Sequence, residues 1–134
     1  MTEQFDLIVV GSGAAGLSVA LGAGTALRVA VVSRGVIGLD GASCWAQGGI
    51  AAAVGAGDSA AQHAADTISA GARLNSKPAV RWLAESAPEV VRWLIALGVQ
   101  FDTVGGRLAL GREAAHSFPR ILHAGGDATG AELM

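Results

Sequence analysis

The sequence predicts an α/β fold that begins with a parallel strand–helix–strand unit, on three observations near its start. Two apolar runs, at 6–10 and 28–33, are rich in valine, which is typical of strands buried on both faces of a sheet. The segment 14–24 between them is rich in alanine and leucine and predicts a helix that ends near Gly22 or Gly24. Together the three segments fit one right-handed βαβ unit.

Three further helices are predicted in the middle of the chain. Alanine, valine and leucine recur there at helical spacing, after the capping candidates Asp58, Ser59 and Ser76 or after a proline. These helices are expected at 58–72, 76–87 and 88–98. The glycine-rich residues 34–57 before them predict a loop, with a short helix at 50–54.

The last third of the chain changes to short apolar runs. Gly105 and Gly106 separate two of these runs and predict a two-residue hairpin. A short strand is expected at 120–123, and 129–132 has the spacing of a capping box, so a last helix begins there. Because the chain stops about one turn into that helix, we expect residues 1–134 to be the N-terminal portion of a longer protein.

Composition argues against several classes of function. The 134 residues carry a formal net charge of −2 and no basic run, which disfavours nucleic acid and anionic membranes as partners. The mean hydropathy of +0.48 comes mostly from alanine and valine, and no apolar stretch is long enough to cross a bilayer. Cys44 is the single cysteine, and no Cys/His cluster indicates a metal site. A cytoplasmic protein without a metal is therefore expected.

The first candidate binding site is the sequence GSGAAG, which follows the first predicted strand. Its three glycines have the G-x-G-x-x-G spacing that lets a pyrophosphate approach the N-terminus of a helix. The predicted phosphate-binding residues are Gly11, Ser12, Gly13, Ala14, Ala15 and Gly16. The alternative is a glycine-rich turn with a structural role only.

The end of the second predicted strand departs from the common dinucleotide site. An acidic residue that binds the ribose is expected about 20 residues after the glycines. Ser33 and Arg34 stand there instead. Arg34 would accommodate the 2′-phosphate of NADP, which keeps an NADP-dependent reductase open, and Ser33 would then be an ordinary strand end.

The segment GASCWAQGGIAAAVG, residues 41–55, combines loop-forming residues with a tryptophan. Trp45 is costly to leave in water, and the pair Gly48 and Gly49 loses much backbone entropy on ordering. Either the segment is a flexible surface insertion, or its small residues let a large flat ligand approach the backbone.

Five segments, in the same order along the chain, resemble the L-aspartate oxidases. They are IVVGSGAAGLS, VVSRG, GASCWAQGGIAAA, GREAAHS and RILHAGGDATGAE. That family consists of flavoproteins of de novo NAD synthesis, akin to the flavoprotein subunits of succinate dehydrogenase and fumarate reductase. The resemblance implies the N-terminal part of a Rossmann-like FAD-binding domain, with inserted helices and a β-hairpin. It also implies that Ser33 and the basic Arg34 take the place of the acidic ribose ligand.

The resemblance assigns the segment 41–55 to the flavin. The FAD-contacting residues that it implies are Ala42, Ser43, Cys44, Trp45, Ala46, Gln47, Gly48 and Gly49. Trp45 would pack, and Gln47 would offer hydrogen bonds. The dehydrogenase and quinol-linked relatives bond the flavin covalently through a histidine at the position of Ala42. Alanine cannot form that bond, so FAD is expected to bind non-covalently.

A substrate-binding residue is also implied by the resemblance. In L-aspartate oxidases, a glutamate in the motif that ends in HS meets the amino group of the substrate, and Glu113 fills that place. Gly111 stands where that family usually has threonine, and Ala114 and Ala115 where it has two glycines, which leaves the shape of the loop open. From the residues alone, Glu113 is a solvated loop carboxylate.

The activity implied is the oxidation of L-aspartate to iminoaspartate, the first step of NAD biosynthesis from aspartate. Oxygen or fumarate would reoxidise the flavin, and quinolinate synthase would consume the product. No catalytic residue is expected within these 134 residues, so the chain alone is expected to be inactive. The alternatives are a fumarate reductase-like or succinate dehydrogenase-like flavoprotein, which Ala42 and Glu113 disfavour, and an inactive fragment.

The remaining histidines and tryptophans are interpreted as packing or positioning residues. His63 is expected to face solvent, and His116 and His123 to position the loop at most. Trp82 and Trp93 lie on neighbouring predicted helices and are expected to pack.

Overall fold

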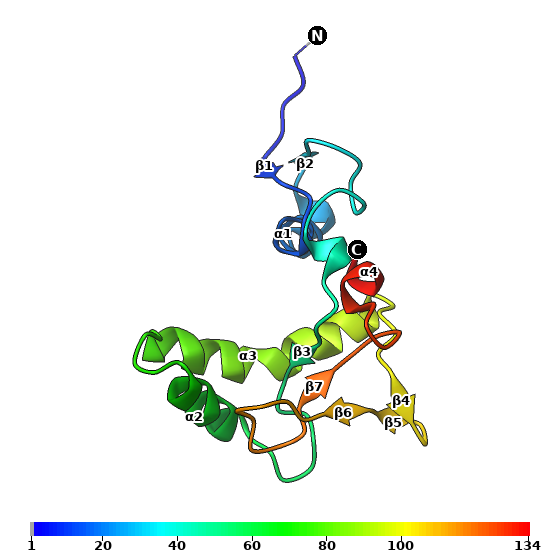
Figure 1. Ribbon diagram of the computed structural model, residues 1–134. Helices are drawn as coiled ribbons and strands as arrows, with labels where there is room; N and C mark the ends of the chain where they lie inside the picture. Colours follow the sequence, from blue (N-terminus) through cyan, green and yellow to red (C-terminus); the bar gives the residue numbers. More distant parts are fainter. Residues whose placement is uncertain (1) are drawn as a thin grey trace. The chain divides into compact units, whose positions relative to one another are not determined.

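The computed structural model describes residues 2–134, and these residues form two units (Figure 1). The first unit runs to Ala46 and includes Gly130–Met134, and the second unit comprises Gln47–Thr129. The chain contains both helices and strands and begins with a parallel strand–helix–strand unit, so the predicted α/β fold class is confirmed.

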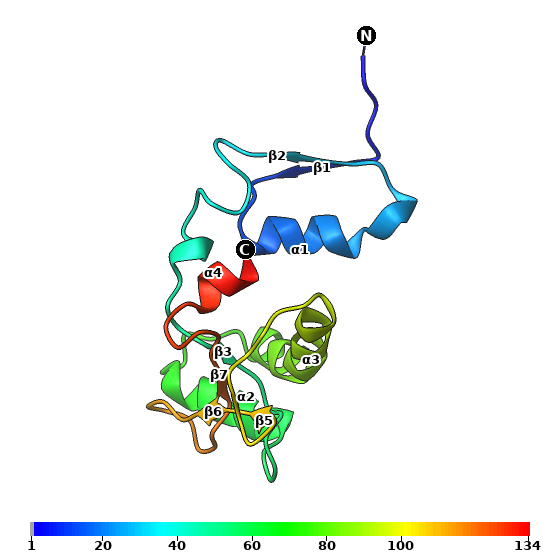
Figure 2. The same ribbon diagram turned by 90° about the vertical axis from the view of Figure 1, so that its right-hand side faces the viewer.

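The first unit contains the predicted strand–helix–strand element (Figure 2). Its elements are β1 (Leu7–Val10), α1 (Ala14–Gly22), a 3₁₀ turn (Gly24–Ala26), β2 (Val29–Val32) and a second 3₁₀ turn (Ser43–Trp45). Strands β1 and β2 pair in parallel, with Leu7 opposite Val29. The amide of Gly11 continues this pairing by donating to the carbonyl of Val32 at 2.8 Å, and the chain then turns into α1.

Burial of β1 differs from the sequence-based expectation. Val9 is buried on the side where the backbone of Gly16, in α1, approaches its side chain. Ile8 and Val10 are 61% and 84% exposed. The prediction that these strands are buried on both faces is therefore wrong for β1, because α1 covers only one face and successive side chains point to opposite faces.

The second unit combines two helices with short antiparallel strands. Its elements are β3 (Ile50–Ala51), α2 (Ala60–Ala70), α3 (Lys77–Ala96), β4 (Thr103–Val104), β5 (Arg107–Leu108), β6 (Leu110–Gly111) and β7 (Ile121–Leu122). Strand β7 is the centre of a three-stranded sheet and is antiparallel to both β3 and β6. The core of this unit is formed by the buried residues Ala52, Val91, Phe101, Leu122 and Ala124.

Three local predictions are confirmed in detail. Strands β4 and β5 form the hairpin at Gly105 and Gly106, whose φ values of +59° and +76° are those that a two-residue turn requires. Ser59 caps α2, since its hydroxyl accepts a hydrogen bond from the amide of Gln62 at 3.2 Å. Helix α4 (Thr129–Leu133) begins at the expected residue, although the hydroxyl of Thr129 accepts from the amide of Ala124.

Two element predictions are wrong. The helices expected at 76–87 and 88–98 are one helix, α3, with Pro88 inside it. Val80, Ala84 and Val91 are all buried along one stripe of this helix, and burying a continuous stripe outweighs the loss of one backbone hydrogen bond at the proline. The short helix expected at 50–54 is strand β3, which pairs with β7 far along the chain. No helix within residues 2–134 is both long and apolar enough to cross a membrane.

Replacing Pro88 with alanine should stabilise the protein by about 1–2 kcal/mol, because alanine restores an amide donor inside α3 and fits the helix better than proline. Denaturant unfolding of the variant and the parent protein measures this difference. Pro78→Ala is the matched control. Pro78 lies in the first turn of α3, where an amide has no intrahelical partner, so this change should leave stability the same or slightly lower. An equal gain from both substitutions would contradict the explanation.

Candidate functional site

The predicted phosphate-binding loop lies between β1 and α1, and its conformation favours glycine at each of its three glycine positions. Gly11 has φ +111°, a backbone conformation that side chains rarely adopt. A Cβ on Gly16 would collide with the carbonyl oxygen of Gly11, and a Cβ on Gly13 would lie 3.1 Å from the hydroxyl of Ser43. The chain therefore turns tightly into α1, whose first-turn amides have no partner within the helix.

The 3₁₀ turn Ser43–Trp45 packs directly against this loop. The hydroxyl of Ser43 accepts a hydrogen bond from the amide of Ala14, the first residue of α1, at 3.1 Å. On its other side the turn meets α4, because the amide of Gly130 donates to the carbonyl of Ala46 at 2.8 Å. A Cβ on Gly130 would collide with the backbone of Ser43 and Ala46, so this glycine is required by close approach. This role of Gly130 was not predicted, and the glycine within the TGAE segment was the available signal.

Ser33 lies beside the phosphate-binding loop. It follows β2, and its hydroxyl lies 2.8 Å from the hydroxyl of Ser12, which is buried. Arg34, the next residue, is exposed. The structure thus brings together Ser12, Ser33 and the helix N-terminus, which is the arrangement expected of a dinucleotide site.

The residues of the 42–49 segment divide between the two units. Trp45 is 79% exposed, so it does not pack against the part of the chain that the structure describes, and its contact with FAD stays a prediction. The thiol of Cys44 lies 3.1 Å from the carbonyl oxygens of Leu39 and Gly41, and Ala42 is exposed. Gln47, Gly48 and Gly49 belong to the second unit. There, a Cβ on Gly49 would collide with Ile121 and Leu122 of β7, so the strand pairing itself requires a glycine.

The predicted substrate residue lies on a loop of the second unit. Glu113 follows β6, and its side chain is 59% exposed. One carboxylate oxygen lies 3.8 Å from Nε2 of His123, which follows β7 and is 29% exposed. Ala115, two residues after Glu113, has φ +71°. The loop therefore keeps a left-handed conformation although alanine occupies the position.

A buried ion network next to this loop was not predicted. Arg120 is fully buried, and its Nε and Nη2 atoms bind the two oxygens of Asp58, each at 2.8 Å. Its Nη1 atom binds Asp66 of α2 at 2.8 Å. Asp58 was interpreted as a capping candidate, and it holds this arginine instead. An arginine directly before two apolar residues of a predicted strand was the available signal, but its partners could not be read from the sequence.

The electrostatics of this network favour its charged forms. Hydrogen bonds from the amide and hydroxyl of Ser117, assisted by that from Arg120, lower the pKa of Asp66 to about 2. Burial alone would lower the pKa of Arg120, but the hydrogen bonds that Arg120 donates to Asp58 and Asp66 outweigh burial and raise that pKa. Both charges are therefore present at neutral pH.

His63 is buried, so the prediction that it faces solvent is wrong. It lines a cavity of about 290 Å³ whose other lining residues are Ala51, Thr67, Val80, Leu83, Ala84 and Ala87. Its Nδ1 atom is buried without a hydrogen-bond partner among the described residues. Burial, together with the charge of Arg120, lowers the pKa of His63 below 6.5. Among the tryptophans, Trp82 is 66% exposed and does not pack as expected, and Trp93 is half-buried.

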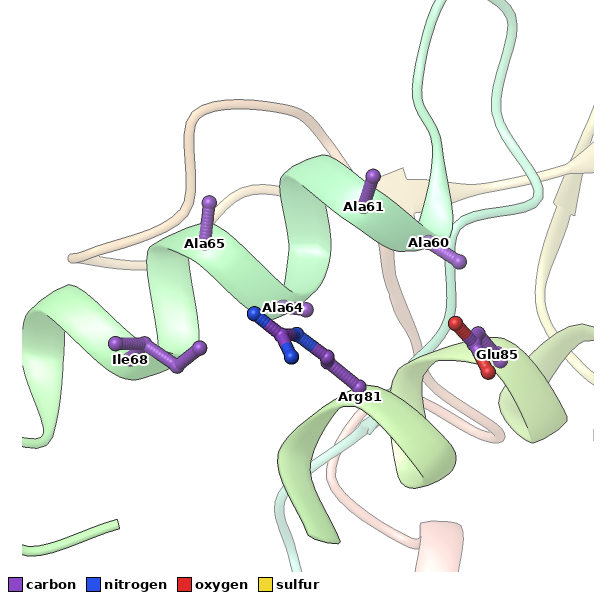
Figure 3. A pocket seen from close by; sticks show the side chains of 7 residues that line it. All are labelled: Ala60, Ala61, Ala64, Ala65, Ile68, Arg81 and Glu85. Carbon is purple, nitrogen blue, oxygen red and sulfur yellow. The ribbon is translucent and has the colours of Figure 1, made fainter. Parts of the chain in front are cut away.

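A second cavity, of about 320 Å³, lies between α2 and α3 (Figure 3). Four alanines and Ile68 line its α2 side, and Arg81 and Glu85 extend from α3. It contains no histidine, cysteine or hydroxyl side chain. The phosphate-binding loop of the first unit and the Glu113 loop of the second therefore remain the two candidate sites.

The FAD binding domain family matches residues 6–134 of the sequence. The chain belongs to this family. The predicted resemblance is also confirmed, since the chain is 53% identical over 130 residues to an L-aspartate oxidase of Streptomyces coelicolor. That similarity covers 96% of this chain and 22% of the relative, so the chain spans under a quarter of the relative's length.

Solved structures of related flavoproteins share the fold. The Mycobacterium smegmatis Sdh1 complex matches with a TM-score of 0.88 and 36% identity, over 96% of this chain and 22% of that one. An Escherichia coli quinol fumarate reductase matches with a TM-score of 0.90 and 27% identity, over 99% of this chain and 23% of that one. The prediction of a Rossmann-like FAD-binding fold is confirmed by these matches.

As in its family, FAD is the cofactor of this chain, and the phosphate-binding loop fits it. The glycines leave a surface without side chains at the start of α1, where a Cβ at Gly13 would already crowd Ser43. The first-turn amides and the helix dipole favour a phosphate there. Ser33 is placed at the strand end where a ribose hydroxyl binds in dinucleotide folds.

Replacing Ala115 with glycine should stabilise the protein by about 0.5–1 kcal/mol, because glycine adopts the left-handed conformation without steric cost. Ala114→Gly is the matched control, since Ala114 does not have a positive φ. It should destabilise by about 0.5–1 kcal/mol through the greater freedom of the unfolded chain. Thermal or denaturant unfolding of both variants tests this. The same sign of change in both would contradict the strained loop conformation.

Replacing His63 with leucine should remove a pH-dependent loss of stability. The folded pKa of His63 lies below 6.5, so the unfolded chain takes up a proton that the folded protein does not. Stability from this group is therefore complete above pH 6.5 and is lost as the pH falls toward the lower folded pKa. The pKa of Asp66 is lowered from 3.8 to about 2, so the stability that this carboxylate contributes is lost only at more acidic pH. Denaturant unfolding between about pH 7.5 and 5 should show a smaller slope in the variant; an unchanged slope would contradict this.

Proposed function

We propose that this chain is the FAD-binding part of an L-aspartate oxidase, which oxidises L-aspartate to iminoaspartate. The observation that carries this proposal is the identity of 43–53% to L-aspartate oxidases over 95% or more of the chain. Because the chain spans 22–26% of those relatives, we also propose that it is the N-terminal portion of a longer enzyme that supplies the catalytic residues. The 134 residues alone should then be inactive.

In this proposal the first unit holds the cofactor. FAD, when bound, accepts the two electrons that the substrate loses. The amides of Gly13, Ala15 and Gly16 bind the pyrophosphate, since that of Ala14 donates to Ser43. Ser33 with Arg34 binds the adenosine part. The backbone of 42–49 lies along the flavin. Ala42 has no nucleophilic atom, so FAD is held without a covalent bond.

In this proposal, Glu113 binds the amino group of the substrate. L-aspartate and succinate share two carboxylates and differ by an ammonium group. A carboxylate paired with that ammonium gains a charge-assisted hydrogen bond of about 1.5–3 kcal/mol. The exposure of the Glu113 side chain, on a loop without regular structure, supports this role.

The wider context follows from the same proposal. Oxygen or fumarate accepts the electrons, and quinolinate synthase consumes the iminoaspartate. A cytoplasmic location is supported by the single cysteine, which allows no intrachain disulfide.

A fumarate reductase-like or succinate dehydrogenase-like activity is the second candidate. The TM-scores of 0.88–0.90 to such proteins favour it. The lower sequence identity of 27–36% and the alanine at position 42 make it the weaker one.

The substitution Glu113→Gln in the full-length enzyme tests the proposed function. It should raise the KM for L-aspartate by about ten- to hundredfold, which corresponds to the loss of one charge-assisted hydrogen bond. Fumarate reduction needs no ammonium partner and should be largely unchanged. Both activities are measured on the same preparation.

Glu89→Gln, a change at an exposed glutamate of α3, is the matched control and should alter neither activity. Equal losses for aspartate and fumarate in Glu113→Gln would mean that Glu113 supports the loop or the flavin. No loss of either activity would mean that Glu113 is a solvated carboxylate without a role in substrate binding.

A further inference from the structure

The loop that carries Glu113, residues 112–119, contains no helix or strand and links β6 to β7. Ala115 inside it has φ +71°, a conformation that costs a non-glycine residue about 1–2 kcal/mol. Such a conformation persists only where the surrounding structure holds it. The shape of the Glu113 loop therefore depends on its contacts with the rest of the second unit.

Asp66 of α2 holds this loop at Ser117. Its Oδ2 atom accepts a hydrogen bond from the amide of Ser117, and its Oδ1 atom accepts one from the hydroxyl, each at 2.7 Å. The Oδ2 atom also accepts from Nη1 of Arg120 at 2.8 Å. Both oxygens of one carboxylate are thus used to join the loop, a helix and the start of β7.

Arg120 holds the same loop at His116. Its Nη1 atom lies 3.2 Å from Nδ1 of the imidazole. A guanidinium can only donate, so Nδ1 must accept, which places the imidazole proton on Nε2. Arg120 cannot shift to follow the loop, because Asp58 binds its other two nitrogens and the side chain is fully buried. The orientation of His116 is therefore set by a fixed group.

These two anchored residues determine the backbone around Glu113. The amide of His116 donates to the carbonyl of Glu113 at 3.2 Å, which closes a turn over the strained Ala115. The carbonyl of His116 accepts from Nε of Arg112 at 2.9 Å, so the residue before Glu113 is tied to the same point. The carboxylate of Glu113 itself is mostly exposed and has no hydrogen bond to the network.

We propose that Arg120 and Asp66 are positioning residues that place Glu113 for binding the ammonium group of the substrate. They act through His116 and Ser117 and do not contact Glu113 themselves. This inference rests on the proposed function, in which Glu113 distinguishes an amino dicarboxylate from a plain dicarboxylate. Affinity for aspartate would then depend on a buried ion network that the substrate never touches.

A double-mutant cycle between Asp66→Asn and Glu113→Gln in the full-length enzyme tests the inference. Asparagine has the shape of aspartate and can keep the three contacts, with its amide nitrogen donating to the hydroxyl of Ser117, but it removes the negative charge that Arg120 faces. Asp66→Asn should raise the KM for aspartate about tenfold, as one lost charge-assisted hydrogen bond would. The kcat and the fumarate activity should change little. The double variant should lose no more aspartate affinity than Glu113→Gln alone.

Two outcomes would overturn the inference. Additive losses in the double variant would show that Asp66 and Glu113 act independently. Equal losses for aspartate and fumarate in Asp66→Asn would show a general structural role. Ser117→Ala removes only one hydrogen bond to Asp66 and should show the same pattern in weaker form, should Asp66→Asn fail to fold. Glu89→Gln again serves as the control.

Amide hydrogen exchange separates this inference from the proposed function. Asp66→Asn, or Ser117→Ala in its place, should speed exchange at residues 113–117 while α3 exchanges as in the parent enzyme. This readout needs no substrate. An enzyme without activity on aspartate would refute the proposed function, and unchanged exchange in the Glu113 loop would refute the positioning role.

Discussion

The second unit depends on the burial of one positive charge. Arg120 has no exposed surface, and taking a guanidinium out of water is costly unless every donor finds an acceptor. Asp58, Asp66 and His116 provide acceptors for four of its five N–H groups, and they come from a helix entry, a helix and a loop. Removing any one would leave a charge or a donor unpaired in the interior, where the penalty exceeds the energy of the lost bond. The network thus fixes how α2, β7 and the loop between β6 and β7 meet.

The first unit is determined by a different constraint, the close approach of backbone to backbone. Gly16 lies against the carbonyl of Gly11, and Gly130 lies against Ser43 and Ala46. Ordinary side chains at these positions would push the segments apart. The same lack of side chains that allows this packing also leaves the first-turn amides of α1 other than that of Ala14, which donates to Ser43, accessible to a phosphate. Packing and cofactor binding therefore both require residues without bulky side chains at these positions.

Features that depend on neighbours in the sequence could be predicted. The strand–helix–strand unit, the Gly105–Gly106 hairpin and the Ser59 cap follow from spacing and local chemistry alone, and the family followed from five short segments. The position of the glycine loop between β1 and α1 was predicted in the same way, from the spacing of its three glycines. Features that depend on distant partners could not be predicted from local patterns.

Arg120 illustrates this limit most clearly. Its carboxylate partners lie 62 and 54 residues earlier in the chain, and nothing near Asp58 or Asp66 indicates which cation they bind. His63 is buried because α2 and α3 pack together, whereas its own helix is rich in small residues on every side. The continuity of α3 through Pro88 likewise reflects tertiary packing that outweighs local propensity.

The division of the chain also has a consequence during synthesis. The first unit is discontinuous, since Gly130–Met134 pack onto a segment that ends at Ala46, and the whole second unit is made in between. A ribosome adds about 5–20 residues per second, so the nascent first unit waits roughly 4–17 s for its last element. The second unit is one continuous segment, so all of its residues have been made before Gly130 reaches its partner Ala46.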